Sequence, residues 1–245
     1  MFQIESIGSV ARISLSRPEA RNAIAIASWE GFAEAIASVG RSGARVLILR
    51  SAVPGIFCAG ADITDLDRLH ADPALRGHFR TMMAQAIEAL AALPIATIAA
   101  IDGGCFGAGV ALAMACDIRL AGAKAAFGIT PAKLGISYPA SDVARLRALV
   151  GPGQAARLLY SAMTIVAIEA RAIGLIEEMV DDADAAAQAL AATIAANSPS
   201  SIAVLKRSLA GDRASDTLFE DAFGSANFIE GVRAFRDRRR PDFTA

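Results

Sequence analysis

Two turns rich in glycine and alanine are the segments of this 245-residue chain best suited to chemistry. The first, Ala59-Gly60-Ala61, follows a short apolar stretch, and the second, at residues 103–109, follows the apolar run at residues 95–101. Small residues let main-chain N–H groups approach a ligand closely, especially where a helix begins. Two such donors aimed at one carbonyl oxygen stabilise an enolate or a tetrahedral intermediate, and one donor is worth roughly 3–4 kcal/mol of barrier. Either turn alone is weak evidence, because a glycine turn between a strand and a helix more often serves simple packing.

The elements that must position these turns alternate along the chain. Residues 2–15 predict two short strands joined at Gly8-Ser9, and a helix is predicted from an N-cap at Ser28 to Gly40. A buried strand at residues 45–50, helical stretches within 64–93, a strand at 95–101 and a helix at 108–116 follow. Strands that alternate with helices in this way predict βαβ units and a parallel sheet.

The sequence after Gly151 predicts helices almost throughout, in alanine-rich segments near residues 153–161, 167–173, 183–196, 199–210 and 216–238. The last segment carries an apolar stripe at helical spacing, formed by Leu218, Phe219, Ala222, Phe223, Ala226 and Ile229. Such a stripe must be buried, either within its own domain or against another subunit.

Composition excludes several classes of function. The chain has 24 Lys+Arg and 25 Asp+Glu, so its net charge of -1 gives no attraction to nucleic acid or to an anionic membrane. Its three cysteines are odd in number and lack C-x-x-C spacing, which favours a reducing cytoplasm and no metal site. The apolar stretch at residues 89–116 is interrupted by Pro94, Asp102 and glycines, and the N-terminus lacks a signal-peptide pattern. We therefore expect a cytoplasmic protein without a membrane span.

Several motifs together resemble the crotonase (enoyl-CoA hydratase/isomerase) superfamily in order and spacing over nearly the whole chain. They are SRPEARNA at residues 16–23, FCAGADI at 57–63, DGGCFGAG at 102–109, Phe127-Gly128, KLG at 133–135, and the segment 235–243. The resemblance implies an α/β fold with a spiral ββα core and acyl-CoA site in residues 1–190. It also implies a C-terminal helical trimerisation region in residues 191–245, trimers or paired trimers, and no cofactor apart from the coenzyme A of the substrate.

Site residues follow from matching these motifs position by position. The resemblance places the oxyanion-hole N–H groups on Ala61 and Ala108. The residues matched to the coenzyme A side and the acyl pocket are Arg21, Ala23, Ala59, Asp62, Ile63, Phe106, Gly107 and Pro131. Arg238 matches a basic residue, more often lysine, that contacts the nucleotide phosphates, although a solvated helix end is the alternative for this basic cluster. Asp62 has a structural alternative as the cap of the following helix.

Two departures from the family pattern bear on the reaction. Hydratases of this family use two glutamates, whose positions here match Ala111 and Pro131, and neither residue can titrate. The Thr-Pro, Leu-Gly and Tyr pattern within residues 127–139 resembles the methylmalonyl-CoA decarboxylase branch, which makes Tyr138 and Thr130 the candidate polar catalytic groups. That branch has a histidine at the position of Ala61, which this chain lacks.

Other reactive residues have ordinary alternatives. His70 and His78 have no assigned place. Asp142 either enters the pocket from the next helix, caps that helix, or is simply exposed to solvent. A thiol nucleophile at Cys58 or Cys105 has no histidine near it in sequence.

The remaining hypotheses for the function are hydration or isomerisation, decarboxylation of a malonyl-type CoA, thioester hydrolysis, and an acyl-CoA-binding protein without turnover. A serine hydrolase is disfavoured because histidine is scarce.

Overall fold

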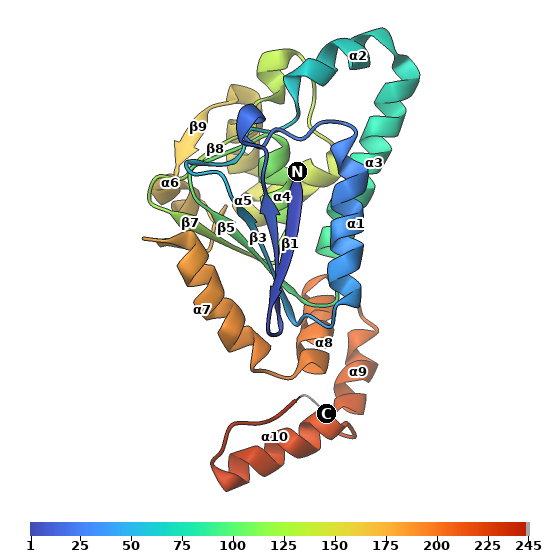
Figure 1. Ribbon diagram of the computed structural model, residues 1–245, viewed down its shortest axis with the longest axis vertical. Helices are drawn as coiled ribbons and strands as arrows, with labels where there is room; N and C mark the ends of the chain where they lie inside the picture. Colours follow the sequence, from blue (N-terminus) through green and yellow to red (C-terminus); the bar gives the residue numbers. More distant parts are fainter. Residues whose placement is uncertain (244–245) are drawn as a thin grey trace.

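The computed structural model describes residues 1–243, in which two β-sheets are covered by helices (Figure 1). The larger sheet has the strand order β1-β2-β3-β5-β7-β10. Its strands are β1 (Phe2–Ile7), β2 (Val10–Leu15), β3 (Val46–Ser51), β5 (Ala96–Ile101), β7 (Ile118–Gly122) and β10 (Glu178–Val180). Only β1 runs antiparallel to its neighbour, while the other pairs are parallel. The predicted parallel sheet and its first two strands are confirmed.

The central strands of the larger sheet are mostly apolar and are largely buried on both faces. Along β3, Val46 and Ile48 point toward helix α7 (Ala183–Ala195), whereas Leu47 and Leu49 join the main core on the opposite face. This alternation is the two-residue period of a strand. Helix α7 meets the sheet through an alanine at every fourth position, which brings its backbone close to the strands; these residues are Ala183, Ala187, Ala191 and Ala195.

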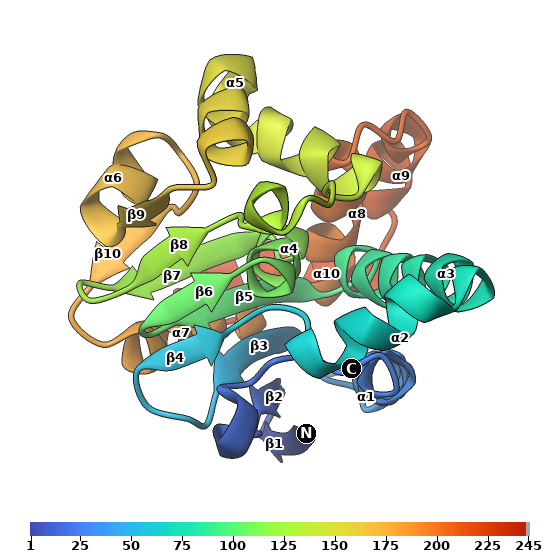
Figure 2. The ribbon, with the colours of Figure 1, turned by 90° about the horizontal axis from the view of Figure 1, so that it is seen from above.

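The opposite face of the sheet carries α1 (Ser28–Arg41), α3 (Pro73–Ala91) and α4 (Ala108–Ala115). Trp29, Phe32 and Ile36 of α1 are fully or almost fully buried there. Helix α4 is buried along its whole length, in agreement with its lack of any polar side chain. Figure 2 shows α4 enclosed between the strands, α3 and the helix α5 (Ala140–Ser161). The residues that begin α4 are therefore held on several sides.

A second, smaller sheet lies beside the first, with the order β4-β6-β8-β9. Its strands are β4 (Ile56–Cys58), β6 (Gly104–Phe106), β8 (Ala126–Gly128) and β9 (Thr164–Val166). Each of the first three follows directly on a strand of the larger sheet, in the pairs β3–β4, β5–β6 and β7–β8, before a helical segment begins. This repeated strand–strand–helix unit is the predicted ββα core.

The remaining helices differ in several details from the sequence prediction. Helix α5 contains a non-helical Gly151 at φ 75°, followed by Pro152, so it consists of two segments. The predicted cap at Ser28 is wrong, because Ala27 is the N-cap and Ser28 already lies inside α1. The predicted single helix at 216–238 is also wrong, because Ser225 caps a new helix there. The short helices are α2 (Leu66–Ala71), α6 (Ala167–Ala172) and the 3₁₀ turns η1 (Pro18–Ala20), η2 (Ile63–Asp65) and η3 (Pro131–Leu134).

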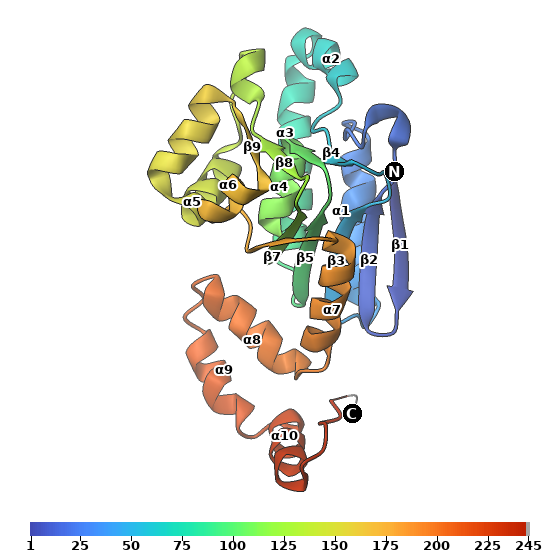
Figure 3. The same ribbon diagram turned by 90° about the vertical axis from the view of Figure 1, so that its left-hand side faces the viewer.

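The C-terminal helices extend away from the sheets in an arc (Figure 3). They are α8 (Pro199–Leu209), α9 (Ser215–Ala222) and α10 (Ala226–Asp237), and the predicted division at residue 190 falls inside α7. The predicted apolar stripe remains largely exposed in the single chain, including Phe219, Phe223 and Ile229. None of the helices in residues 1–243 combines the length and apolar character that crossing a membrane requires.

Candidate active site

The turns that follow β4, β6 and β8 come together at one edge of the smaller sheet. These three strands are neighbours and run parallel, so their carboxyl ends meet at the same edge. The first turn contains Ala61, the second contains Gly107 and Ala108, and the third leads to Thr130 and Pro131. A hydrogen bond of 2.9 Å from the Gly107 N–H to the Gly128 carbonyl joins the second turn to the third. The fold therefore assembles most of the predicted catalytic positions at a single place.

The N–H of Ala61 is directed away from its neighbouring segment. Ile24 forms a parallel bridge with Ala61, in which the Ile24 N–H donates to the Gly60 carbonyl at 2.8 Å. The Ile24 carbonyl accepts from the Asp62 N–H at 3.0 Å. Because hydrogen bonding alternates along an extended segment, the N–H between these two bonds points to the other side. Within residues 1–243 it donates no backbone hydrogen bond, and Ala61 is exposed.

The N–H of Ala108 belongs to the first residue of α4 and therefore has no partner within that helix. The helix begins after Gly107, whose backbone at φ 47° and ψ -114° is accessible mainly to glycine. The helix dipole places partial positive charge at this end, which favours a negatively charged ligand atom. In the part of the chain described, no backbone acceptor takes this N–H.

The first and second turns are in contact. A Cβ atom built on Gly60, which has φ 107°, would lie 3.2 Å from the Phe106 carbonyl oxygen and 3.7 Å from the Ala108 nitrogen. A Cβ on Gly109 would lie 2.7 Å from the Cβ of Cys58, which is tighter than real contacts. Glycine at these positions therefore lets the two turns approach, so that the N–H groups of Ala61 and Ala108 lie at neighbouring points.

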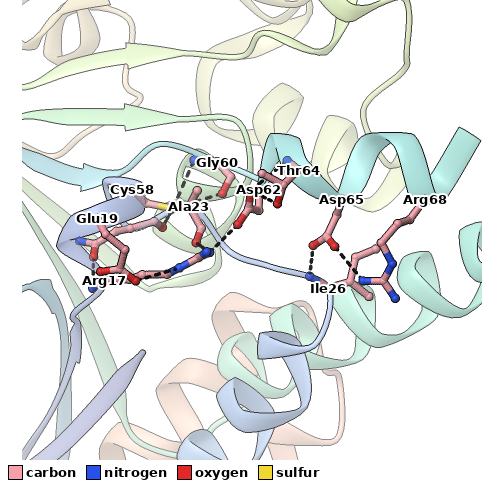
Figure 4. A network of polar contacts seen from close by, with 11 residues as sticks. Arg17, Glu19, Ala23, Ile26, Cys58, Gly60, Asp62, Thr64, Asp65 and Arg68 are labelled. Carbon is pink, nitrogen blue, oxygen red and sulfur yellow. Dashed lines mark hydrogen bonds and ion pairs between the residues drawn. The ribbon is translucent and has the colours of Figure 1, made fainter.

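A network of polar contacts holds the first turn in place (Figure 4). The Arg17 guanidinium forms an ion pair with Asp62 at 2.6 Å, and Asp62 also accepts hydrogen bonds from the Thr64 N–H and hydroxyl. Hydrogen bonds from Thr64, then the one from Arg17, lower the pKa of Asp62. Asp65 accepts from the Ile26 N–H at 2.8 Å, and so ties the start of α2 to the segment before α1. The structural alternative for Asp62 as a cap is confirmed, while its partner Arg17 was not predicted.

Tyr138 contacts the second turn through its hydroxyl group. The phenol O–H donates to the Gly107 carbonyl oxygen at 2.9 Å, and the half-buried ring packs against the main core. Burial, followed by the nearby charge of Asp142, holds the pKa of Tyr138 well above its ordinary value, while the Ala111 N–H acts in the opposite direction. The phenol is therefore a neutral hydrogen-bond donor. Thr130, the other predicted polar group, is half-buried and directly precedes η3.

Ala111 and Pro131 stand where the sequence comparison placed the missing glutamates. Ala111 is 1% exposed on the first turn of α4, and its N–H donates to the Gly107 carbonyl at 3.2 Å. Pro131 is the first residue of η3, directly after Thr130. Both positions are adjacent to the turns that meet at the sheet edge, yet neither can carry a proton on its side chain. No cluster of His, Cys, Asp and Glu suited to a metal ion is present within residues 1–243.

Asp142 is a buried carboxyl in the first turn of α5. It is 1% exposed and pairs with Arg145 at 3.4 Å, and Arg145 in turn pairs with Glu88 of α3 at 2.9 Å. Burial is the main cause that raises the pKa of Asp142 to about 6, while Arg145 lowers it and Glu88 raises it. The predicted alternatives of capping and solvation are both wrong, because Pro139 is the N-cap and the carboxyl is shielded from water.

The cysteines and histidines are poorly suited to catalysis at the turns. Burial raises the pKa of the Cys58 thiol to about 12 and that of Cys105 well above its ordinary value, which disfavours the thiolate form that a nucleophile requires. His70 lies on α2 and His78 on α3, and both are exposed.

The residues matched to coenzyme A divide into two groups. Most lie on or beside the first two turns, where the Arg21 carbonyl accepts from the Ala59 N–H at 3.1 Å. These residues range from buried Ala23 to Ile63, which is 69% exposed, and include half-buried Phe106. Arg238 is different, because it ends α10 at the opposite end of the molecule from α2 (Figures 1 and 3). A single chain does not bring Arg238 to the turns.

Comparisons with known proteins agree with this geometry. The model of the enoyl-CoA hydratase/isomerase family matches residues 5–245. The bovine mitochondrial enoyl-CoA hydratase domain-containing protein 2 is 33% identical over 96% of this chain and 84% of its own length. Mouse mitochondrial methylglutaconyl-CoA hydratase is 34% identical over 81% of this chain and 68% of its own length.

Solved structures lead to the same conclusion. An enoyl-CoA hydratase/carnithine racemase from Magnetospirillum magneticum superimposes with a TM-score of 0.95 at 32% identity, over 100% of this chain and 95% of that one. An enoyl-CoA hydratase from Bacillus anthracis gives a TM-score of 0.91 at 29% identity, over 99% and 98% of the two chains. The chain therefore belongs to the enoyl-CoA hydratase/isomerase family of the crotonase superfamily.

Proposed function

We propose that this protein binds an acyl-CoA thioester and stabilises the enolate oxyanion of its acyl group through the N–H groups of Ala61 and Ala108. One observation carries the proposal. These two N–H groups lie on touching turns, and within residues 1–243 neither is used by a backbone acceptor. Both turns are held by contacts that do not involve these N–H groups, so the donors are positioned before a ligand arrives.

The chemistry of the thioester explains why such donors accelerate a reaction. When electrons move from the α-carbon toward the carbonyl, negative charge collects on the carbonyl oxygen. Two fixed N–H dipoles, one of them at the positive end of α4, stabilise this charge more than they stabilise the neutral carbonyl. The site lowers the barrier to any step that passes through the enolate, whichever bond at the α- or β-carbon changes.

The side chains around the turns favour one class of step as a second candidate. Ala111 and Pro131 cannot exchange protons, so the two-carboxylate route of hydration has no carrier at these positions. Decarboxylation of a malonyl-type CoA needs no strong base: the bond between the α-carbon and the carboxylate breaks, and its electron pair forms the enolate. A proton from solvent then restores the α-carbon. Decarboxylation is therefore the specific reaction that these substitutions favour over hydration and isomerisation.

Replacing Ala108 by proline tests the oxyanion assignment, because it removes one N–H. Proline is tolerated at the first position of a helix, and the preceding Gly107 has no Cβ to clash with the ring. We expect kcat to fall by about 10²- to 10³-fold while the protein remains folded. The matched control is Ala226→Pro at the first position of α10, which is expected to leave kcat unchanged. An Ala108→Pro protein that folds and turns over at the wild-type rate would show that the assignment is wrong.

The candidate reactions are distinguished by incubating the protein with crotonyl-CoA and with methylmalonyl-CoA and measuring the masses of the products. Loss of carbon dioxide from methylmalonyl-CoA supports decarboxylation, and rapid addition of water to crotonyl-CoA contradicts the reasoning from Ala111 and Pro131. Release of free coenzyme A indicates thioester hydrolysis. Tight binding without turnover over a broad thioester panel supports the remaining alternative, an acyl-CoA-binding protein without activity.

The proposed function requires no cofactor besides the coenzyme A portion of the substrate. We propose further that the chain forms homotrimers or pairs of trimers in the cytoplasm through its C-terminal helices. The support is the exposed apolar surface of α9 and α10, where Phe219, Phe223 and Phe228 stack in edge-to-face contacts but remain open to solvent. Light scattering of the purified protein measures the subunit number.

A further inference from the structure

The hydroxyl of Tyr138 contacts a main-chain group that is directly linked to the proposed oxyanion donor. It donates to the Gly107 carbonyl oxygen at 2.9 Å. That carbonyl and the Ala108 N–H are the two ends of one peptide group, the bond between residues 107 and 108. The phenol therefore binds the oxygen of the same amide whose N–H faces the site.

We infer that Tyr138 is a positioning residue that orients and polarises the Gly107–Ala108 peptide, so that the Ala108 N–H becomes a stronger donor to the thioester oxygen. A hydrogen bond to an amide oxygen draws electron density toward that oxygen and increases the positive charge on the N–H. Tyr138 thus acts through the peptide and not by touching the substrate. The inference rests on the proposed function, because it deepens the role of the Ala108 N–H.

The Gly107 carbonyl oxygen accepts several hydrogen bonds. Besides the phenol, it accepts the Val110 N–H at 3.0 Å and the Ala111 N–H at 3.2 Å. The N–H of Gly107 itself is bound to the Gly128 carbonyl at 2.9 Å. These bonds fix the planes of the peptide groups on both sides of Gly107, whose backbone at φ 47° has few steric restraints of its own. Tyr138 supplies the only side-chain donor to this carbonyl within residues 1–243.

The surroundings of Tyr138 keep it in the form that this role requires. Since burial holds the pKa of the phenol well above its ordinary value, the hydroxyl is protonated near neutral pH and has a proton to donate. Its ring is packed against the main core just before α5, so the hydroxyl has little freedom to turn elsewhere. An ionised phenolate would instead repel the Gly107 carbonyl oxygen.

The size of the effect follows from the strengthening expected in a chain of hydrogen bonds. Each added bond strengthens the next by about 10–30%, and loss of one oxyanion donor lowers kcat by about 10²- to 10³-fold. Loss of the phenol hydroxyl should therefore reduce kcat by roughly 2- to 8-fold. The affinity for the ground-state thioester depends mostly on the coenzyme A portion, so KM should change little.

The experiment uses Tyr138→Phe, which removes only the hydroxyl, and Tyr160→Phe as its matched control. Tyr160 is the other tyrosine of the chain and lies 83% exposed on α5. The probe is butyryl-CoA labelled with ¹³C at the thioester carbonyl, and the readout is the carbonyl stretching frequency by infrared difference spectroscopy. We expect binding to the wild type to lower this frequency, the Tyr138→Phe protein to lower it less, and Tyr160→Phe to match the wild type.

The outcomes separate the two proposals. A wild-type protein that binds butyryl-CoA without lowering the carbonyl frequency contradicts the proposed oxyanion hole. A wild-type lowering that Tyr138→Phe reproduces in full overturns the role of Tyr138 and leaves the oxyanion hole in place. If Tyr138→Phe fails to fold, 3,5-difluorotyrosine at position 138 gives the answer instead. This residue keeps the ring and is a stronger donor, so it should lower the frequency further, and an unchanged frequency overturns the inference.

Discussion

Replacing Asp142 by asparagine is expected to change how the stability of the fold depends on pH. The carboxyl is 1% exposed, and its partner Arg145 is also engaged by Glu88. Burial penalises the charged form and raises the pKa of Asp142 from 3.8 to about 6. Asparagine has nearly the same shape but carries no titrating proton, so it isolates this effect.

The sign and magnitude follow from proton linkage. Between pH 3.8 and about 6 the unfolded chain has released the Asp142 proton while the folded protein retains it. The stability that this group contributes is therefore fully present below pH 3.8 and is lost as the pH rises through about 6. A shift of this size at about 1.36 kcal/mol per pH unit corresponds to about 3 kcal/mol in total. Roughly 2 kcal/mol of it falls between about pH 4 and pH 7.

The assay is urea unfolding of the wild type and of Asp142→Asn at several pH values from about 4 to 7. Taking the difference between the two proteins cancels the contributions of titrating groups that do not interact with residue 142. Relative to Asp142→Asn, the wild type should lose stability as the pH rises and level off above about pH 7. Asp67→Asn on the exposed surface of α2 is the control and should give a flat difference. A flat or rising difference for Asp142→Asn would refute the assignment of a carboxyl whose pKa is raised by burial.

Two further predictions concern packing and the thiols. Gly103→Ala should destabilise the fold by at least about 2 kcal/mol in urea unfolding, because its Cβ would lie 2.1 Å from the backbone of Gly55 at a φ of 85°. Gly31→Ala, in an open position on α1, should instead be neutral or stabilising by up to about 1 kcal/mol, and equal losses for both variants would contradict this account. All three cysteines are buried, with the pKa of Cys58 and of Cys116 raised to about 12, so thiol reagents should label them only after unfolding. Rapid labelling of the native protein would show that the thiols are accessible.

The long strands were predictable from sequence because burial on both faces leaves a continuous apolar run. β3 and β5 are such runs, and both were predicted within one residue of their observed limits. The strands of the smaller sheet have three residues each, which is too short for a periodic pattern. Their existence depends on pairing between segments that are distant in the chain. The break before α10 did have a local signal, since Gly224 precedes the capping Ser225.

The site was predictable to the extent that it is built from local backbone chemistry. Glycine and alanine turns after apolar strands indicated main-chain donors, and the resemblance to the crotonase superfamily assigned them to Ala61 and Ala108. The fold brings these turns into contact. Side-chain contacts across the fold were not predictable in the same way. The bond from Tyr138 to Gly107 joins residues 31 positions apart, and its direction depends on how α5 packs on α4. The ion pair between Arg17 and Asp62 likewise requires the three-dimensional arrangement.

The use of main-chain donors in the two turns determines which mutations can remove them. A point mutation replaces a side chain but leaves the N–H of that residue in place, unless the new residue is proline. The proposed activation of the thioester would therefore survive most point mutations at Ala61 and Ala108. Residues such as Ala111 and Pro131, which contribute side chains next to the same turns, can be exchanged without removing either donor. Under the proposed function, proteins with this backbone can gain or lose proton-transfer side chains, and so change their reaction, while the two N–H donors remain in place.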